Sequence, residues 1–203
     1  MHDTAGFHDT QHFPDDGKYA NTFPVEYPAI IDLDVMPLQK MHDWFMTSVN
    51  ASDTGTIGLN DFELGEIVAF LPYVSLVNVE LDDDGRILDY KIRITSQTLE
   101  RLFGMLPNSS AKEAFPPSIY ERWRYCFERT LARKMPVYAC SNVMGADRTF
   151  RHVDALFLPL RGSDKNNALI ISVNHVDWTD DNLAYINVSQ LPQAANQLYQ
   201  PAL

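Results

Sequence analysis

The feature that most constrains this chain is a change of hydrophobic period at Pro72. Apolar residues recur every three or four positions before it and alternate with polar ones after it, over 73–81 and again over 87–95. Residues 82–85 between the alternating runs read Asp-Asp-Asp-Gly, which is typical of a tight turn because Gly85 tolerates a positive φ. Two half-buried strands joined by such a turn predict an antiparallel β-hairpin. We expect its two apolar faces to consist of Val77, Val79 and Leu81, and of Leu88, Tyr90, Ile92 and Ile94.

Two helices are predicted ahead of the hairpin. Residues 37–49 carry an apolar stripe at helical spacing, and residues 61–70 follow Asn60, with Glu63 completing a capping box. Three more helices are predicted after it, at 97–103, from Ser110 to Pro116, and at 118–135. The last is the most strongly amphipathic of them, and its stripe contains Ile119, Trp123, Cys126, Phe127, Leu131 and Met135.

Three strand-like segments close the patterned region, at 137–144, 149–160 and 168–176. Strands at both ends with helices grouped between them predict an α+β fold, a five-stranded antiparallel sheet with helices on one face. The expected organisation is a flexible tail at 1–23, a helical extension at 24–70, the sheet-containing domain at 71–177 and a second tail at 178–203.

The charge balance argues against two classes of partner. Acidic residues outnumber basic ones 27 to 16, a net charge of −11, which repels nucleic-acid phosphates and anionic membranes. Neither a signal peptide nor an apolar run of roughly 18 residues is present, so we expect a cytoplasmic protein. Basic residues gather only at Arg122, Arg124, Arg129, Arg133 and Lys134, where interleaved glutamates predict a solvated helix face.

At the hairpin and the short helix after it, the residues are similar to a known family. Residues 92–97 read Ile-Arg-Ile-Thr-Ser-Gln and 99–104 read Leu-Glu-Arg-Leu-Phe-Gly. They resemble a signature of the PAS domain family, in which a strand ending in Tyr-Arg-Leu-Val-Gly-Thr precedes a helix ending in Leu-Phe-Gly. Ser96 and Gln97 stand where the family has Gly-Thr. The resemblance covers about residues 71–177 and is closest to bacterial single-domain PAS-like proteins.

The resemblance implies a PAS-like fold and a non-enzymatic sensory or regulatory module. Such a module would bind a small molecule, a partner signalling protein or both, and would signal through association, with a homodimer as the expected assembly. The 37–70 helices are expected either to cover the sheet or to form that dimer interface. The candidate ligand pocket, lined by aromatic side chains and a few polar ones, comprises Tyr90, Phe103, Trp123, Phe127, Asn142, His152 and Asn174.

No cofactor and no metal are predicted. Haem-binding relatives take a His from the long helix, and residues 118–135 contain no His. Light-sensing flavin relatives take a Cys from the short-helix region, and residues 97–116 contain no Cys. A calcium loop starting at Glu80 would place Lys91 where a carboxylate is needed. Metal binding by His8 and His12 would need a helix that Gly6 and Pro14 disfavour.

Two alternatives stay open. His152 and Asp154 share a strand face and could form an acid–base pair in a small cone-fold enzyme of the isomerase kind, although a structural hydrogen bond is the simpler interpretation. A protein–protein adaptor with a filled core is the other. Cys126 and Cys140 are interpreted as small buried hydrophobic residues, with no catalytic role.

Overall fold

The computed structural model describes residues 35–178, apart from 62, 63, 105–107, 109, 116 and 145–149. The predicted tails lie outside this part, except for Trp178, as does Glu63 of the predicted capping box. The division into domain and tails therefore stays a prediction.

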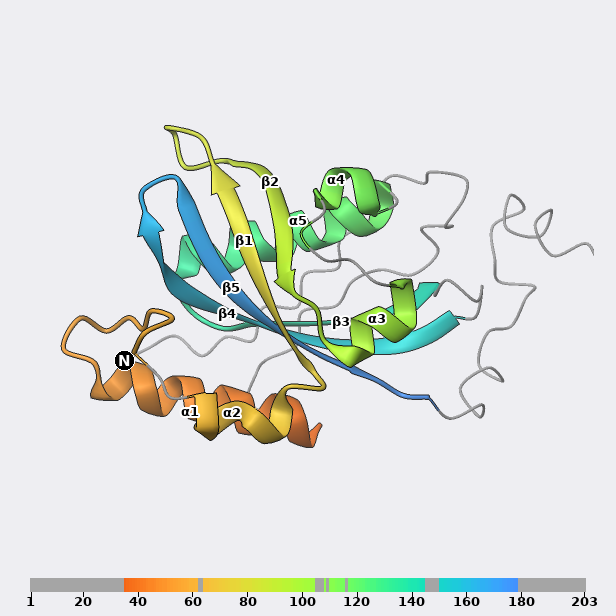
Figure 1. Ribbon diagram of the computed structural model, residues 1–203, viewed down its shortest axis with the longest axis horizontal. Helices are drawn as coiled ribbons and strands as arrows, with labels where there is room; N and C mark the ends of the chain where they lie inside the picture. Colours follow the sequence, from red (N-terminus) through yellow and green to blue (C-terminus); the bar gives the residue numbers. More distant parts are fainter. Residues whose placement is uncertain are drawn as a thin grey trace, which may run out of the picture.

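One five-stranded antiparallel sheet organises the described residues (Figure 1), in the order β2-β1-β5-β4-β3. Its strands are β1 (Val74–Leu81), β2 (Ile87–Ile94), β3 (Val137–Met144), β4 (Phe150–Asp164) and β5 (Asn167–Val176). Strands β1 and β5 are the first and last along the chain, and they pair with each other inside the sheet. The middle of the sheet therefore depends on contacts between residues that are distant in sequence. This is the predicted α+β, PAS-like fold.

The hairpin of β1 and β2 forms as predicted. Asp82 Oδ1 accepts hydrogen bonds from the backbone N–H groups of Asp84 and Arg86, at 2.9 and 2.8 Å. Gly85 has φ +79°, the left-handed conformation that favours glycine.

The predicted apolar face of β2 is wrong at both ends of the strand. Tyr90 and Ile92 are buried, but Leu88 is 60% exposed and Ile94 55% exposed, whereas Ile87 is buried. The pairing shifts by one residue at two points, so that Leu81 pairs with Ile87 and Leu76 with Ile94. Each bulge turns the following side chains to the other face of the sheet.

Helices cover both faces of the sheet. On one face lie α3 (Gln97–Phe103), α4 (Ala111–Ala114) and α5 (Pro117–Arg133), and on the other lie α1 (Met36–Ala51), α2 (Leu64–Ile67) and the 3₁₀ turn η2 (Val68–Phe70), as Figure 1 shows. Of the two roles expected for the N-terminal helices, the structure shows that they cover the sheet, and the dimer interface stays a prediction. Of the predicted 61–70 segment, the structure describes one helical turn, Leu64–Ile67, continued as the 3₁₀ turn Val68–Phe70, while residues 62 and 63 lie outside the described part.

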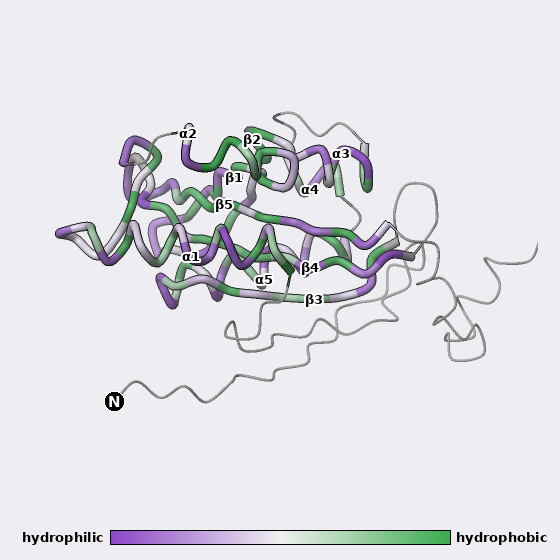
Figure 2. The backbone as a smooth tube through the Cα atoms, turned by 90° about the horizontal axis from the view of Figure 1, so that it is seen from below, coloured by the Kyte–Doolittle hydropathy of each residue, from purple (hydrophilic) through white to green (hydrophobic). Residues whose placement is uncertain are grey.

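The apolar stripe of α1 explains why this helix docks. Leu38, Met41 and Phe45 recur at helical spacing and are at most 2% exposed, packed on the β4 and β5 side chains below them. Figure 2 shows hydrophilic and hydrophobic residues alternating along α1 and the strands. Burying side chains of this size contributes about 1.5–3 kcal/mol each, enough to hold the extension on the sheet.

Strand β4 continues past the predicted end at Leu160, as far as Asp164. A bulge between Leu160 and Asp164 lets the chain turn into β5. Gly162 lies inside it, and a Cβ there would sit 1.6 Å from the carbonyl oxygen of Asn167. Only glycine fits at this position.

Candidate functional site

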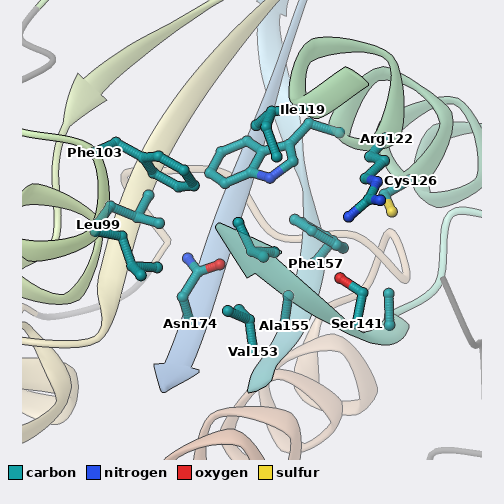
Figure 3. A pocket seen from close by; sticks show the side chains of 14 residues that line it. Leu99, Phe103, Ile119, Arg122, Cys126, Ser141, Val153, Ala155, Phe157 and Asn174 are labelled. Carbon is teal, nitrogen blue, oxygen red and sulfur yellow. The ribbon is translucent and has the colours of Figure 1, made fainter. Parts of the chain in front are cut away.

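A small cavity lies between the sheet and the helices α3 and α5 (Figure 3). Its volume is about 40 Å³, room for a few water-sized molecules. The walls come from α3, α5 and the inward faces of β3, β4 and β5, and they are formed by Leu99, Leu102, Phe103, Ile119, Arg122, Trp123, Cys126, Ala139, Ser141, Val143, Val153, Ala155, Phe157 and Asn174.

Three polar side chains interrupt these apolar walls. Arg122 enters from α5, while Ser141 and Asn174 approach from the strands (Figure 3). Asn174 is 1% exposed and donates through Nδ2 to Ser172 Oγ at 2.8 Å. These groups can orient a polar ligand in an otherwise apolar space.

Arg122 corrects the prediction of a solvated basic face. Its side chain is 6% exposed, and Nη1 donates to the backbone carbonyl of Asn142 at 3.3 Å. Arg122 lies one helical turn before the buried Cys126 on α5. The side of α5 that packs on the sheet is wide enough to include Arg122. The prediction holds for Arg124, which bridges Glu121 and Glu128 at 2.7 and 3.1 Å.

An aromatic cluster fills the core beside the cavity. Tyr90 is fully buried, stacks on Tyr120 at 5.0 Å between ring centroids and meets Phe127 edge-on at 4.9 Å. Its hydroxyl donates to the backbone carbonyl of Tyr120 at 3.1 Å. Burial, reinforced by the nearby Tyr120, raises the pKa of Tyr90 well above the usual value of a tyrosine.

The predicted pocket residues fall into three places. Phe103, Trp123 and Asn174 line the cavity. Tyr90 and Phe127 belong to the aromatic cluster behind it. Asn142 and His152 pair with each other across β3 and β4, on strand positions that alternate with the cavity-lining Ser141 and Val153.

Sequence reasoning missed Arg122 and Ser141. Ser141 could have been found from the β3 pattern, because Val137, Ala139, Ser141 and Val143 alternate with more polar neighbours. Arg122 gave no such signal, because an arginine next to a glutamate is the ordinary pattern of an exposed helix face.

A second group of polar residues lies on the opposite face of the sheet. His152 Nε2 is 3.4 Å from Asp154 Oδ1, which also accepts a 2.5 Å hydrogen bond from the Tyr138 hydroxyl. His175 Nδ1 lies 3.9 Å from Asp154 Oδ2, and Cys140 is close to both His152 and Asp154. The expectation that His152 and Asp154 share a face is confirmed.

Asp154 is buried at the centre of this group. Its burial would raise the pKa of the carboxyl, but hydrogen bonds from His152 and Tyr138 and the charges of His152 and His175 outweigh it, so the pKa is lowered. The cone-fold alternative needs a carboxyl inside the apolar cavity with a raised pKa. Asp154 lies on the other side of the sheet. Cys140 also differs from its prediction, being half-buried among polar groups, whereas Cys126 is buried as predicted.

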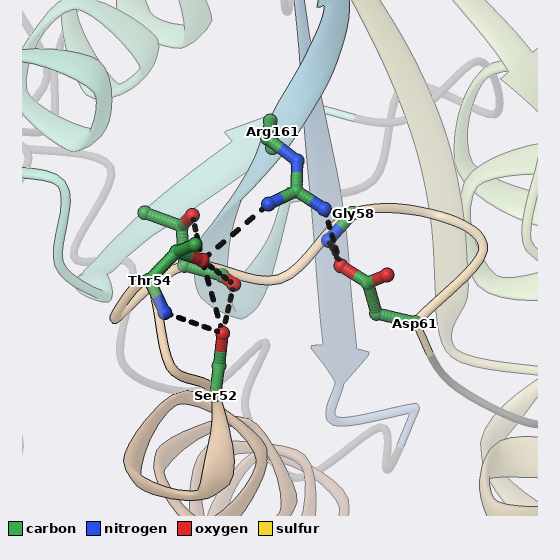
Figure 4. A network of polar contacts seen from close by, with 6 residues as sticks. Ser52, Thr54, Gly58, Asp61 and Arg161 are labelled. Atoms are coloured by element: carbon green, nitrogen blue, oxygen red, sulfur yellow. Dashed lines mark hydrogen bonds and ion pairs between the residues drawn. The ribbon is translucent and has the colours of Figure 1, made fainter.

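A polar groove of about 650 Å³ runs beside the loop that follows α1. Its charged groups largely neutralise one another. Lys91 Nζ lies 2.7 Å from Glu80, whose hydrogen bond raises the pKa of Lys91, and Arg161 lies 2.7 Å from Asp61 (Figure 4). Arg93 also lines the groove, so one positive charge exceeds the two ion pairs there.

The sheet order and helix placement define the class as a PAS-like α+β fold. No family model matches the chain, and no curated protein matches it. Among solved structures, it is similar to a fungal LOV domain photoreceptor, with 16% identity over 71% of this chain and 92% of that one and a TM-score of 0.36. It is also similar to a sensory box histidine kinase/response regulator from Burkholderia thailandensis E264, with 12% identity over 66% and 96% of the chains and a TM-score of 0.34.

Among the described residues, no helix is both long enough and apolar enough to cross a bilayer.

Proposed function

We propose that this chain is a PAS-type regulatory module that binds a small polar or anionic molecule in its inner cavity and signals by associating with another protein. The observation that carries the proposal is Arg122, a residue 6% exposed in the wall of a mostly apolar cavity. Arginine is rarely buried to this extent, and its planar set of donors suits carboxylate and similar oxyanions.

The dimensions of the cavity limit the ligand. Sites for drug-sized ligands occupy about 300–1,000 Å³. At about 40 Å³, this cavity suits molecules of a few heavy atoms, such as formate, nitrate or acetate. Ser141 and Asn174 supply further polar groups opposite Arg122. The module would thus respond to a small metabolite anion, without a large resident cofactor.

The proposed module has no catalytic activity of its own. No Asp, Glu or His occurs among the described residues that line the cavity, so it lacks the usual side chains for moving protons at neutral pH. Its output then depends on assembly, either with a partner signalling protein or as a homodimer, since symmetric pairing is the commonest assembly. Bacterial origin and a cytoplasmic location stay predictions from the sequence.

Ligand binding is tested by thermal unfolding of the full chain in formate, acetate or nitrate, with chloride at equal ionic strength as reference. A ligand present at 100 times its Kd stabilises the folded state by about 2.7 kcal/mol. The shift should vanish in Arg122→Met and persist in Arg124→Met, which removes a guanidinium from the same helix but outside the cavity. Equal shifts in both variants would contradict the proposal.

The small size of the cavity also favours one alternative, a protein–protein adaptor whose core is filled. Native mass spectrometry of the purified chain separates the two. A co-purifying small molecule supports the ligand-binding module. A chain that binds nothing across the anion series but forms a complex supports the adaptor, and a strictly monomeric chain contradicts signalling through self-association.

A further inference from the structure

We propose that Cys140, His152, Asp154 and His175 form a binding site for a divalent transition-metal ion of the zinc class. These residues lie on the face of the sheet opposite the cavity, so the site is separate from the one proposed above. Neither the cavity ligand nor signalling through association depends on it.

The strand register brings the four residues together. Cys140 on β3 is paired with Asp154 on β4, and Asp154 is paired in turn with His175 on β5, so the three form one row across neighbouring strands. His152 precedes Asp154 by two positions and therefore points to the same face. Side chains directly opposite each other in antiparallel strands have Cβ atoms about 4.5–5.5 Å apart, so Asp154 can share an ion with Cys140 on one side and with His175 on the other. Cys140 and His175 themselves lie two strands apart, about 9–10 Å at the backbone, and their side chains would have to lean toward Asp154.

The ligand atoms are already near the spacing that a metal needs. One donor atom each from Cys140, His152 and Asp154 lie within 4.8 Å of one another. Around a tetrahedral zinc ion with bonds of about 2.0–2.3 Å, ligand atoms are separated by roughly 3.3–3.8 Å. Side-chain rotations would bring these three donor atoms to that spacing.

His175 is the fourth ligand that we propose, although it lies outside the group of three whose donor atoms are within 4.8 Å of one another. Its Nδ1 is 3.9 Å from Asp154 Oδ2 and is buried without a hydrogen bond. Asp154 Oδ1 accepts a hydrogen bond from the Tyr138 hydroxyl. The other carboxylate oxygen, Oδ2, lies on the side of His175 and can bind an ion. A hydrogen bond that orients a ligating carboxylate in this way is the usual outer support of a metal site.

The donor set selects the metal class. One thiolate, two imidazoles and one carboxylate are borderline-soft ligands that suit zinc or cobalt, whereas calcium and magnesium prefer sites made only of oxygen. Four protein ligands would complete a tetrahedron and leave no open position, which is typical of structural sites. Such an ion would join β3, β4 and β5.

The test is titration of the full, chelator-treated chain with cobalt chloride, followed by zinc chloride. Cobalt in this site should give the visible bands of tetrahedral Co²⁺ and a near-ultraviolet thiolate charge-transfer band, with a stoichiometry of one, and zinc should displace it. Binding without a thiolate band, or no binding, would overturn the proposal. The first result would assign the metal to other groups, such as the histidines of residues 1–34.

Matched variants locate the ion. Cys140→Ser should abolish the thiolate band although Cys126 remains, and His175→Gln should weaken cobalt binding by more than tenfold. Tyr138→Phe, which removes only the supporting hydroxyl, should weaken it by about 10–100-fold. His42→Gln is the control, because His42 also lies beside an aspartate, 3.5 Å from Asp43, but does not belong to the group of Cys140, His152 and Asp154. An equal loss in His42→Gln would overturn the assignment.

Discussion

Arg161 on β4 donates to Asp61, in the loop after α1, with 2.7 Å between Nη2 and Oδ2 (Figure 4). The same arginine donates its backbone N–H to the Ile57 carbonyl at 2.8 Å. A polar contact and a backbone contact thus tie the N-terminal extension to the sheet at one residue.

The ion pair should contribute far less to stability than the apolar stripe beneath it. Both side chains are more than 40% exposed, and exposed pairs are worth about 0–1 kcal/mol. A double-mutant cycle with Arg161→Ala and Asp61→Ala should give a coupling energy in that range, whereas Phe45→Ala should lower the free energy of unfolding by about 3–5 kcal/mol. Urea denaturation measures both. If Phe45→Ala lowered the free energy of unfolding by no more than the coupling energy, the apolar stripe would not be the main contribution and the prediction would be wrong.

Adjacent residues of β2 test the bulge near Leu81. Ile87→Ala removes a buried side chain and should lower the free energy of unfolding by about 2–5 kcal/mol. Leu88→Ala changes an exposed position and should stay within about 0.5 kcal/mol of the native chain. The simple alternation of the sequence predicts the opposite, a larger loss for Leu88→Ala than for Ile87→Ala. Chemical denaturation of the two variants therefore distinguishes the bulged register of the structure from the regular register of the sequence pattern.

Gly162 should be the least replaceable of the described glycines. In Gly162→Ala the added methyl group meets the Asn167 backbone, so the β4–β5 turn must shift, at a loss of about 1–3 kcal/mol. Gly65→Ala is the matched control, since Gly65 lies in α2 with open space around its Cβ position, and it should be neutral or stabilising by up to about 1 kcal/mol. Thermal unfolding midpoints that move together in the two variants would argue against the clash.

Stability should fall at alkaline pH through Tyr90. The unfolded chain ionises this tyrosine near pH 10.0, but the folded chain does so only at a higher pH because its pKa is raised. Above pH 10 the unfolded state therefore binds fewer protons than the folded state, and stability decreases as pH rises, until the folded pKa is reached. Below pH 10 this group contributes no pH dependence.

Tyr90→Phe is the variant that checks this. It should lose about 0.5–1.5 kcal/mol at neutral pH, because the hydrogen bond to the Tyr120 carbonyl disappears, and should lose less additional stability than the native chain above pH 10. Denaturation curves at pH 8, 9, 10 and 11 provide the comparison. Parallel pH profiles would show that Tyr90 is not responsible.

Much of the fold followed from local sequence patterns. The hairpin turn at 82–85 and the α5 stripe from Ile119 to Leu131 depend on neighbours within a few residues, so period and turn chemistry were sufficient to predict them. The stripe was wrong at Met135, which lies beyond the end of α5 and is 45% exposed. The resemblance around Leu102, Phe103 and Gly104 then gave the PAS-like arrangement of these elements. The same patterns placed Phe103, Trp123 and Asn174 near one another, and they line one cavity.

The sequence by itself determined which segments become helices and strands, because that choice depends on short-range periodicity. Only the tertiary structure decided the faces and the neighbours. Two bulges moved Leu88 and Ile94 outward, sheet packing buried Arg122, and the pairing of β3, β4 and β5 aligned Cys140, Asp154 and His175. Each of these outcomes is set by a partner strand or helix distant in the chain, and a one-residue difference in register reverses it.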